Sequence, residues 1–426
     1  MSSYHPYWAR VCPCLIVLCA FSARAEDSEP PRTLTVAECL RRAAERNPDL
    51  KPGTYRIEAA SRRARQADRP PNPRLETELE NVAGTGAARG VDASETTVAF
   101  SQELELGGKR RLRTAAAEAE TAVSRADQEA RLRAVLAETR QGALAVQAAQ
   151  EKVRLAEEAL ALARETEVVA EAREQAGKTT VLETDRARAE TAKAQIDCAA
   201  RKTAQREAVR DLALCWGETE PSFDAVSGPF DESSPTLPPL DDLLAGAAAQ
   251  PARLADEARI RAYEARIGVE RAARIPNAEA SIGGRRFQED RDFGFVAGIG
   301  VELPLFTRNL DGVRAAEADA EAARLEADAA RLRNEGRIRR LYARLNALSA
   351  QAEQQRKTVL PLAERSLARV QEAHRQGKAA YLDVLEARRA LVDIRSGLID
   401  TATERQSVFI ELVWLTGASS EKPCHR

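Results

Sequence analysis

Proline-free stretches rich in alanine, leucine and interleaved charges dominate the chain, and this pattern predicts unusually long helices. Residues 109–176 contain no proline and a single glycine, Gly142. At about 1.5 Å per residue, a helix over this stretch is roughly 100 Å long. Residues 312–376 form a second such stretch, in which only Gly336 and Pro361 follow the opening residue, Gly312. A helix of that length is a rod that must pack sideways against other helices.

Four shorter windows have apolar residues at alternate positions and predict β-strands. The alternation is visible in Thr96–Phe100 and again in Phe293–Ala297. Intervening loops divide the windows into two pairs, as β-hairpins require. Each window has about ten residues, the length that a tilted strand needs to cross a membrane. The predicted strands cover residues 74–82, 94–106, 278–288 and 293–305.

The same features occur twice, in the same order, at an offset of about 200 residues, which indicates an internal duplication. The sequence from Gly177 to Glu183 returns, with changes, from Gly377 to Asp383. The prolines that follow the first short helical region have an echo at Pro276. A period of this length is too long for a solenoid.

The duplication divides the chain into two similar repeats. Each repeat begins with a short helical region, at 34–69 or 239–274, for which Thr33 and Asp241 are the expected opening residues. A pair of strands and then a helical hairpin follow. The expected parts are a signal peptide at 1–25, a first repeat at 26–217 with its hairpin at 109–216 and tip at 177, a linker at 218–238, a second repeat at 239–417 with its hairpin at 312–416 and tip at 377, and a tail at 418–426.

The first 25 residues have the pattern of an export signal. Arg10 precedes an apolar run of about 11 residues, and the sequence 23–25 (Ala-Arg-Ala) is a small-residue cleavage site. We expect cleavage before Glu26. Cys19 is not expected to carry a lipid, because Leu18 stands where lipid-attachment signals have a small residue.

Composition and charge narrow the possible functions. The formal net charge is −2, and the 31% of charged residues have both signs interleaved, so no nucleic-acid partner is expected. With three histidines and no metal-type cysteine spacing, the sequence predicts no cofactor, no metal site and no enzyme. Charged residues four apart, such as Asp127/Arg131 and Glu129/Arg133, are expected to form ion pairs along the helices.

The strand windows and the long helices together predict an oligomer. No apolar stretch of the mature sequence reaches 18 residues, so a membrane crossing by this chain would have to use strands. Four strands cannot close a barrel, and open strand edges are not tolerated in lipid. Three copies supply twelve strands and twelve helical columns. The predicted fold class is therefore mainly α with a small β part, in which long helical hairpins form a trimeric α-barrel tunnel and four strands per chain contribute to a twelve-stranded outer-membrane β-barrel.

At these motifs the sequence resembles the TolC-like outer-membrane efflux family, over nearly the whole mature chain. The tip at 377–387 is similar to the family's G-x-x-x-x-x-D-V-L-x-A motif. The segments 71–81 and 100–110 are similar to the outer-membrane subunit of RND-type cobalt–zinc–cadmium efflux systems. The resemblance implies a homotrimer that sits in outer-membrane lipid, extends into the periplasm, docks on a periplasmic adaptor protein and serves an inner-membrane RND pump. It also implies passive conduction of divalent heavy-metal cations such as cobalt, zinc and cadmium.

The resemblance places a periplasmic gate at the hairpin tips. Asp383 and Glu386 are three residues apart on one helix face, and in the family these positions ring the periplasmic aperture. Three copies would gather six carboxylates that attract cations. The alternative is a solvated helix start, where an acidic side chain suits the helix dipole. Glu183 is the equivalent acidic position of the first repeat.

Other tip positions bear on how the gate is held. The family's gate-locking arginine falls at Ala379 here, so Lys378 is a candidate substitute unless the gate is held differently. His374, three residues before Gly377, matches a position where the family can have a gate-holding side chain. Beside Glu183, a histidine that takes up a proton near its ordinary pKa of about 6.5 predicts a gate that loosens on acidification. The alternative is an exposed tip histidine with no such role.

Both hairpin tips also form the expected docking surface for the helices of the adaptor. Gly177 and Gly377 are expected to make the sharp turns. Loop chemistry explains these glycines fully, but it does not explain the repeated Gly-Lys pair. The other expected docking residues are Lys178, Thr180, Lys378 and Tyr381.

Three alternative functions stay open on the sequence alone. A channel that exports drugs or other small molecules has the same features. A periplasmic adaptor also contains a long helical hairpin, but only one, surrounded by β-rich domains. A coiled-coil scaffold without a pore needs neither the strand windows nor the duplication.

Overall fold

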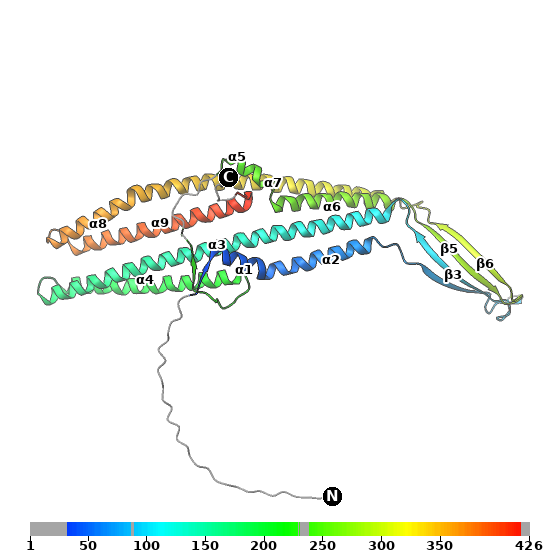
Figure 1. The fold of residues 1–426 in the computed structure, drawn as a ribbon, viewed down its shortest axis with the longest axis horizontal. Coiled ribbons are helices and arrows are strands. Elements are labelled where there is room, and N and C mark those ends of the chain that lie inside the picture. Colours follow the sequence, from blue (N-terminus) through cyan, green and yellow to red (C-terminus); the bar gives the residue numbers. More distant parts are fainter. Residues whose placement is uncertain (1–31, 87–88, 229, 231–237, 419–426) are drawn as a thin grey trace, which may run out of the picture.

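A computed structural model describes residues 32–86, 89–228, 230 and 238–418 of the chain. These residues form a long rod of helices that continues into a β-sheet at one end and finishes in two hairpin tips at the other (Figure 1). The predicted mainly helical fold with a small β part is confirmed. The expected signal peptide at 1–25 lies outside the described residues, as does the expected tail beyond residue 418.

Both halves of the chain contain short helices, a strand pair, a long helix and a return helix, in that order. In the first half the elements are β1 (Thr33–Thr35), α1 (Val36–Arg46), η1 (Pro48–Leu50), α2 (Lys51–Ala67), β2 (Arg74–Glu80), β3 (Glu95–Leu104), α3 (Lys109–Gln175) and α4 (Val181–Leu214). After them come β4 (Ala225–Ser227), α5 (Leu240–Ala247), α6 (Pro251–Ala273), β5 (Ala278–Phe287), β6 (Phe293–Val301), α7 (Leu310–Gln354), η3 (Gln355–Val359), α8 (Leu360–Arg375) and α9 (Tyr381–Thr416).

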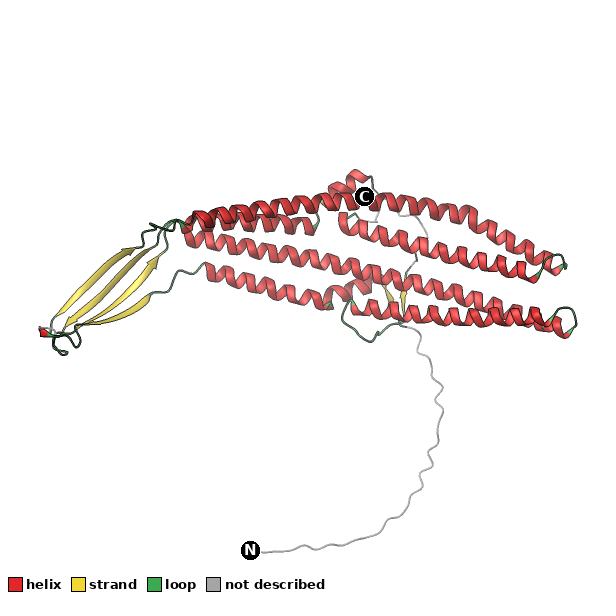
Figure 2. Cartoon of the chain, turned by 180° about the vertical axis from the view of Figure 1, so that it is seen from behind, coloured by secondary structure: helices red, strands yellow, loops and turns green. Residues whose placement is uncertain are grey.

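The 67-residue helix α3 is the central rod of the chain. It packs against α2 and α6 on the side of the sheet and against α4 and α9 on the side of the tips. Figure 2 shows from behind that α2 and α4 follow one another along α3, and that α6 and α9 do the same along the α7–α8 column. Alanines such as Ala143, Ala148 and Ala156 are buried on α3, which lets these columns approach closely.

The helix starts differ from the sequence expectation in both halves, because Asp241 lies inside the first turn of α5, after the N-cap residue Pro239. Thr33 lies in β1, and Thr35 is the residue that caps α1. The Glu38 N–H donates to Thr35 Oγ1 over 3.2 Å, while the Thr35 N–H donates to the Glu38 carboxylate over 2.7 Å. This reciprocal pair satisfies two backbone donors at the start of the helix and so fixes where it begins.

Just before Pro361, the second long stretch contains a π-helical segment, η3, which leads directly into α8. Proline has no N–H, and its ring crowds the carbonyl four residues earlier, which is that of Lys357. A turn widened by one residue accommodates both effects, so the helical rod continues through the proline instead of ending there. The long column of the second hairpin is therefore built of α7 and α8 joined at a wide turn, whereas α3 is continuous.

Strands β2, β3, β5 and β6 form one antiparallel sheet in that spatial order. Strands β3 and β5 pair along their whole length, from Glu95 opposite Phe287 to Leu104 opposite Ala278. Each strand lies inside one of the four predicted windows. Within the described part of the chain, β2 and β6 each have a second edge without a partner strand.

A pair of strands that the sequence did not predict lies halfway along the rod. β4 falls in the expected linker at 218–238 and pairs in parallel with β1. Their side chains join a core that contains Cys39, Leu212 and Trp216, whose ring lies 5.6 Å from that of Phe223. A second core in the other half contains Leu243, Ile338 and Leu412. The two hairpins are thus each anchored at the middle of the molecule.

Candidate functional site: the hairpin tips and the two faces of the sheet

Both tips make the same turn. Gly177 and Gly377 have φ angles of 67° and 72°, in the left-handed region that favours glycine. The next residue closes the helix in each case, because the N–H groups of Lys178 and Lys378 donate over 2.8 Å to carbonyls five residues earlier. Backbone geometry therefore accounts for the two glycines, while the lysine side chains are left on the exposed surface of the tips.

Of the residues expected to dock the adaptor, Lys178, Thr180 and Lys378 are exposed, but Tyr381 is not. The Tyr381 side chain is only 9% exposed and packs with Ala170, Ala187 and Leu385. This small apolar cluster joins α3, α4 and α9, and burial there raises the pKa of the Tyr381 phenol. The expectation that Tyr381 lies on the docking surface is therefore wrong: it holds the tips together.

Asp383 and Glu386 lie on the exposed face of α9. Among the described residues neither carboxylate has an ion-pair partner. Asp383 also caps its helix, because the Ala380 N–H donates to its Oδ2 over 2.8 Å. Asp383 is therefore compatible with both interpretations, the gate and the solvated helix start. Its carboxylate accepts a hydrogen bond at the helix start and also presents a negative charge to solvent.

Glu183, the equivalent position in the first repeat, is half-buried and accepts a hydrogen bond from the Thr179 hydroxyl. It lines a groove of about 400 Å³ between the hairpin tips, together with His374. The structure thus brings Glu183 and His374 into the same groove. It does not join them directly, because the direct partners of His374 are Arg173 and the Ala379 carbonyl, over 3.1 Å and 3.0 Å.

Lys378 does not replace the gate-locking arginine within the protomer. Its ammonium group contacts Gln376 of its own tip, over 2.9 Å, and no residue of the first hairpin. Arginines that the sequence did not single out connect the hairpins instead. Arg389 of α9 pairs with Glu190 of α4, and Arg388 of α9 donates to the Thr166 hydroxyl of α3.

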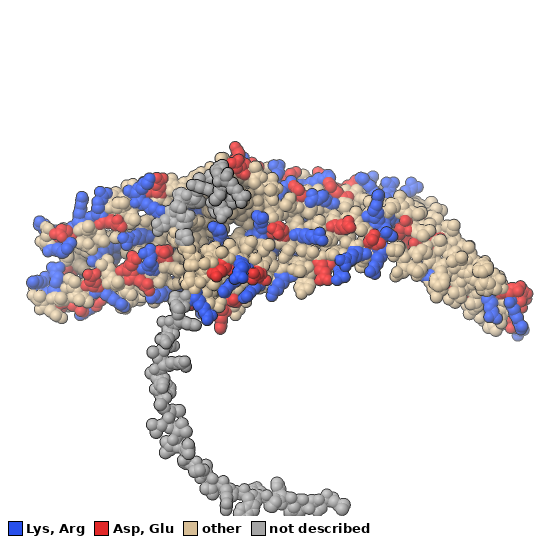
Figure 3. Space-filling model, viewed as in Figure 1, with Lys and Arg blue, Asp and Glu red and all other residues tan. Residues whose placement is uncertain are grey.

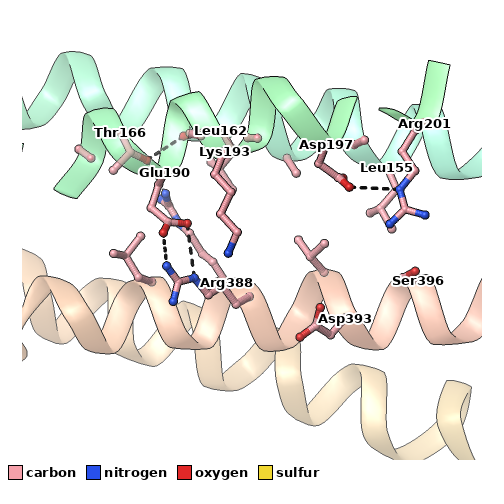
Figure 4. Close-up of a pocket in the computed structure, with 18 of the residues that line it drawn as sticks. Leu155, Leu162, Thr166, Glu190, Lys193, Asp197, Arg201, Arg388, Asp393 and Ser396 are labelled. Carbon is pink, nitrogen blue, oxygen red and sulfur yellow. Dashed lines mark hydrogen bonds and ion pairs between the residues drawn. The ribbon is translucent and has the colours of Figure 1, made fainter. Parts of the chain in front are cut away.

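A second groove continues from the tip groove along the seam between the hairpins, with a volume of about 360 Å³. It is lined by α3, α4 and α9, and Figure 4 shows Lys193 pointing from α4 toward α9 within it. Burial lowers the pKa of the Arg388 guanidinium, which lines both grooves. Farther along the seam, Lys152 of α3 pairs with Asp400 of α9 over 2.6 Å. Polar contacts along this seam therefore help to hold the two hairpins of one chain together, beside the apolar cluster around Tyr381.

One face of the four-stranded sheet is apolar. In a strand every second side chain points to the same face, and the register places the exposed apolar residues of all four strands together. Two of them, Phe295 and Ile299, are 87% and 83% exposed. In the view of Figure 3 the sheet has few charged side chains except near its far end. The face includes Leu75, Leu79, Val98, Phe100, Ile282, Phe293, Phe295 and Ile299.

The opposite face of the sheet is polar and mainly acidic. Arg285 neutralises part of it, because its Nη1 and Nη2 lie 2.8 Å from Glu95 and 3.0 Å from Glu80, and its Nε donates to Thr97. These contacts tie β2, β3 and β5 together near the loops. The same face also contains Glu76, Glu78, Glu103 and Glu279, of which Glu103 and Glu279 stand directly opposite one another.

Two kinds of site are absent from the described ranges. No group of three or more histidine, cysteine or acidic side chains there is placed to hold a metal ion. No described helix combines the length and the apolar composition needed to cross a membrane.

Comparison with known proteins agrees with this architecture. A sequence model of the family described as "Outer membrane efflux protein" matches residues 39–218 and 247–418, one match in each half. The cobalt-zinc-cadmium resistance protein CzcC of Cupriavidus metallidurans is 29% identical over 362 residues, which cover 85% of each chain. The nickel-cobalt-cadmium resistance protein NccC of Alcaligenes xylosoxydans xylosoxydans is 30% identical, over 76% of this chain and 72% of that protein.

Among solved structures, CusC superposes with a TM-score of 0.75 at 22% identity, over 97% of this chain and 99% of CusC. At this identity the likeness shows the fold alone. The family model matches most of the chain, once in each of the two repeats. The resemblance seen in the tip and strand motifs is therefore confirmed. The chain belongs to the outer membrane efflux protein family.

Proposed function

We propose that three copies of this chain form the outer-membrane channel of a tripartite RND-type efflux system, and that the channel passively conducts divalent heavy-metal cations such as cobalt, zinc and cadmium. The observation that carries the proposal is the four-stranded sheet, which has one apolar face, one acidic face and two edges that no described strand covers. Such a sheet is suited to the wall of a membrane barrel, which has lipid on one side and water on the other.

The two open edges support an oligomer. Unpaired N–H and C=O groups on β2 and β6 have no hydrogen-bond partner in lipid, so each edge needs a strand from a neighbouring chain. Three chains supply twelve strands, and the helical columns then enclose a tunnel that continues the barrel into the periplasm. The apolar face lies against lipid, and the acidic face lines the pore.

Family membership establishes the class of protein and its location in the cell. The chain is an outer-membrane transport protein and not an enzyme. A periplasmic adaptor or a coiled-coil scaffold without a pore does not fit a member of this family. The pump and the adaptor are partners that we infer for this chain.

The choice of substrate is supported by the relatives, which are named for resistance to cobalt, zinc, cadmium and nickel. The acidic pore face and the exposed Asp383 and Glu386 suit the passage of cations. We expect a deletion strain to lose growth on graded zinc, cobalt or cadmium and to keep its antibiotic tolerance. Loss of antibiotic tolerance with unchanged metal tolerance would favour the drug channel instead.

The exposed tip lysines give a test of adaptor docking. We expect the double variant K178E/K378E to reduce capture of the trimer by its adaptor about ten-fold or more, because reversing the charge at two contact positions sets like charges against each other. Binding is measured by surface plasmon resonance with a purified periplasmic adaptor protein of a metal-efflux system. The matched control is K51E, an exposed lysine on α2 far from the tips. Equal binding of the double variant and the wild type would remove these lysines from the docking surface.

A further inference from the structure

We propose that the junction between the sheet and the helices binds an anionic glycerophospholipid. The junction is the loop 302–309, between β6 and α7, together with the C-terminal end of α6. Arg274 and Arg308 bind the phosphate of the lipid. Its acyl chains lie against the exposed apolar residues of the loop, which are Leu303, Leu305 and Phe306. The inference rests on the proposed function, because it requires the sheet to stand in the membrane.

The exposed apolar residues of the sheet continue beyond the ends of its strands. On β6, Ile299 and Val301 are exposed, and Leu303 and Leu305 follow after the strand has ended. On β3 the last residue, Leu104, is exposed, and so is Leu106 beyond it. The apolar surface therefore reaches the point where the helices meet the sheet, and it joins the face that we assign to lipid.

Phe306 is the most exposed large apolar side chain of the described residues, at 98%. Such exposure means that the ring contacts almost nothing of its own chain. Soluble surfaces rarely leave several large apolar side chains together in water, so a second molecule is expected to cover this loop. Aromatic residues are also typical of the two levels at which an outer-membrane barrel meets water.

Two arginines stand beside this apolar loop. Arg308 comes two residues after Phe306, and Arg274 is the C-cap residue of α6. The Asn309 side chain donates to the Glu270 carbonyl over 2.9 Å, which ties the loop to the last turns of α6 and brings both arginines to the same end of the rod. Both are exposed, and neither has an ion-pair partner among the described residues. In Figure 3, blue side chains border the tan sheet where the helices meet it.

The acidic residue of the same loop does not neutralise these arginines. Glu302 continues the alternation of β6 on the side of Gly300, which lies opposite Glu279 on the acidic face. The carboxylate is therefore expected on the pore side, and the apolar side of the junction keeps an excess of positive charge.

An anionic phospholipid matches both halves of this surface. Its acyl chains cover the apolar loop, and its phosphate accepts parallel hydrogen bonds from a guanidinium group. Long arginine side chains at a membrane boundary place their charge at the level of the headgroups while their stems lie along apolar surface. A neighbouring copy of the chain is the other possible cover, and the experiment decides between the two.

Native mass spectrometry of the detergent-solubilised protein, titrated with dioleoyl phosphatidylglycerol or with zwitterionic dioleoyl phosphatidylcholine, measures the binding. We expect the wild type to bind phosphatidylglycerol about ten-fold more tightly, because two arginines near an anionic headgroup each contribute several-fold. In R274Q/R308Q we expect the two lipids to bind within about two-fold of each other. In F306A we expect both lipids to bind about five-fold more weakly, because part of the apolar contact is lost.

The matched control is R186Q/R333Q, which removes two exposed arginines of α4 and α7 that also have no ion-pair partner among the described residues. It keeps the wild-type preference. Equal binding of the two lipids by the wild type, or an equal loss of preference in the control, would overturn the lipid site. Loss of the three-chain particle in F306A would assign the loop to a neighbouring copy and would also overturn it.

The same spectra report the number of chains in each particle. A wild type without three-chain particles would contradict the proposed channel, while the lipid adducts on its single chains would still decide whether the two arginines select an anionic lipid.

Discussion

The double substitution D383N/E386Q is expected to raise single-channel conductance about two-fold and to weaken block by divalent cations about ten-fold in planar bilayers. In the proposed trimer these two positions would place six carboxylates at the periplasmic aperture, where we expect them to attract and retain cations. Both side chains are exposed, and neither has an ion-pair partner among the described residues, so their charge is available to the pore.

The amide substitutions are preferred to alanine because Asp383 has two roles. Its carboxylate accepts the Ala380 N–H at the start of α9, and an alanine at position 383 would leave that N–H without its acceptor. Asparagine retains an acceptor and removes only the charge. A matched control is E364Q/E372Q, which neutralises two carboxylates on α8 that already pair with Arg395 and Arg375. Conductance and block like those of the wild type in D383N/E386Q would remove the gate assignment.

A charge on the apolar face of the sheet is expected to have the largest effect on assembly. Ile282 is on that face of β5, and we expect I282R to reduce the trimer recovered from outer membranes to a small fraction of the wild-type amount. An arginine facing lipid near the middle of a bilayer costs about 2–4 kcal/mol per chain. The trimer carries this cost three times, and the measurement is quantitative blotting of unheated outer-membrane extracts.

The control lies one residue away on the same strand. Ser281 points to the opposite face, and S281R places the same side chain toward the pore at nearly the same depth. We expect S281R trimers to be recovered in at least about half the wild-type amount, because a lumen-facing charge stays hydrated. Equal loss of both variants, or equal recovery of both, would contradict the assignment of the two faces.

Much of the fold could be predicted from the sequence because its signals are local. The alternation in Phe293–Ala297, the absence of proline over 109–176 and the repeated Gly-Lys tips each report on a few neighbouring residues. The three-residue strand β4 could not be predicted, since its pairing with β1 joins segments about 190 residues apart. Helix α1 is capped by Thr35 and not by the expected Thr33, because the reciprocal hydrogen bonds between Thr35 and Glu38 determine where the helix begins.

The contacts of the tips were harder to predict, because they depend on how one helix is rotated against another. Glu129 and Arg133 pair as expected, 3.7 Å apart. The pair expected between Asp127 and Arg131 is absent among the described ion pairs: Asp127 pairs with Arg259 of α6 instead. In the same way, the tip motif identified Asp383 and His374. The contact between His374 and Arg173 could not be predicted, because it depends on how α3 packs against the second hairpin.

We propose that one chain supplies a third of a closed cylinder and that three chains complete it. Native mass spectrometry of protein extracted in detergent from isolated outer membranes tests it most directly. We predict particles of three chains that convert to single chains on heating. Monomers recovered from the water-soluble fraction, without a particle of three chains in the membrane extract, would contradict it.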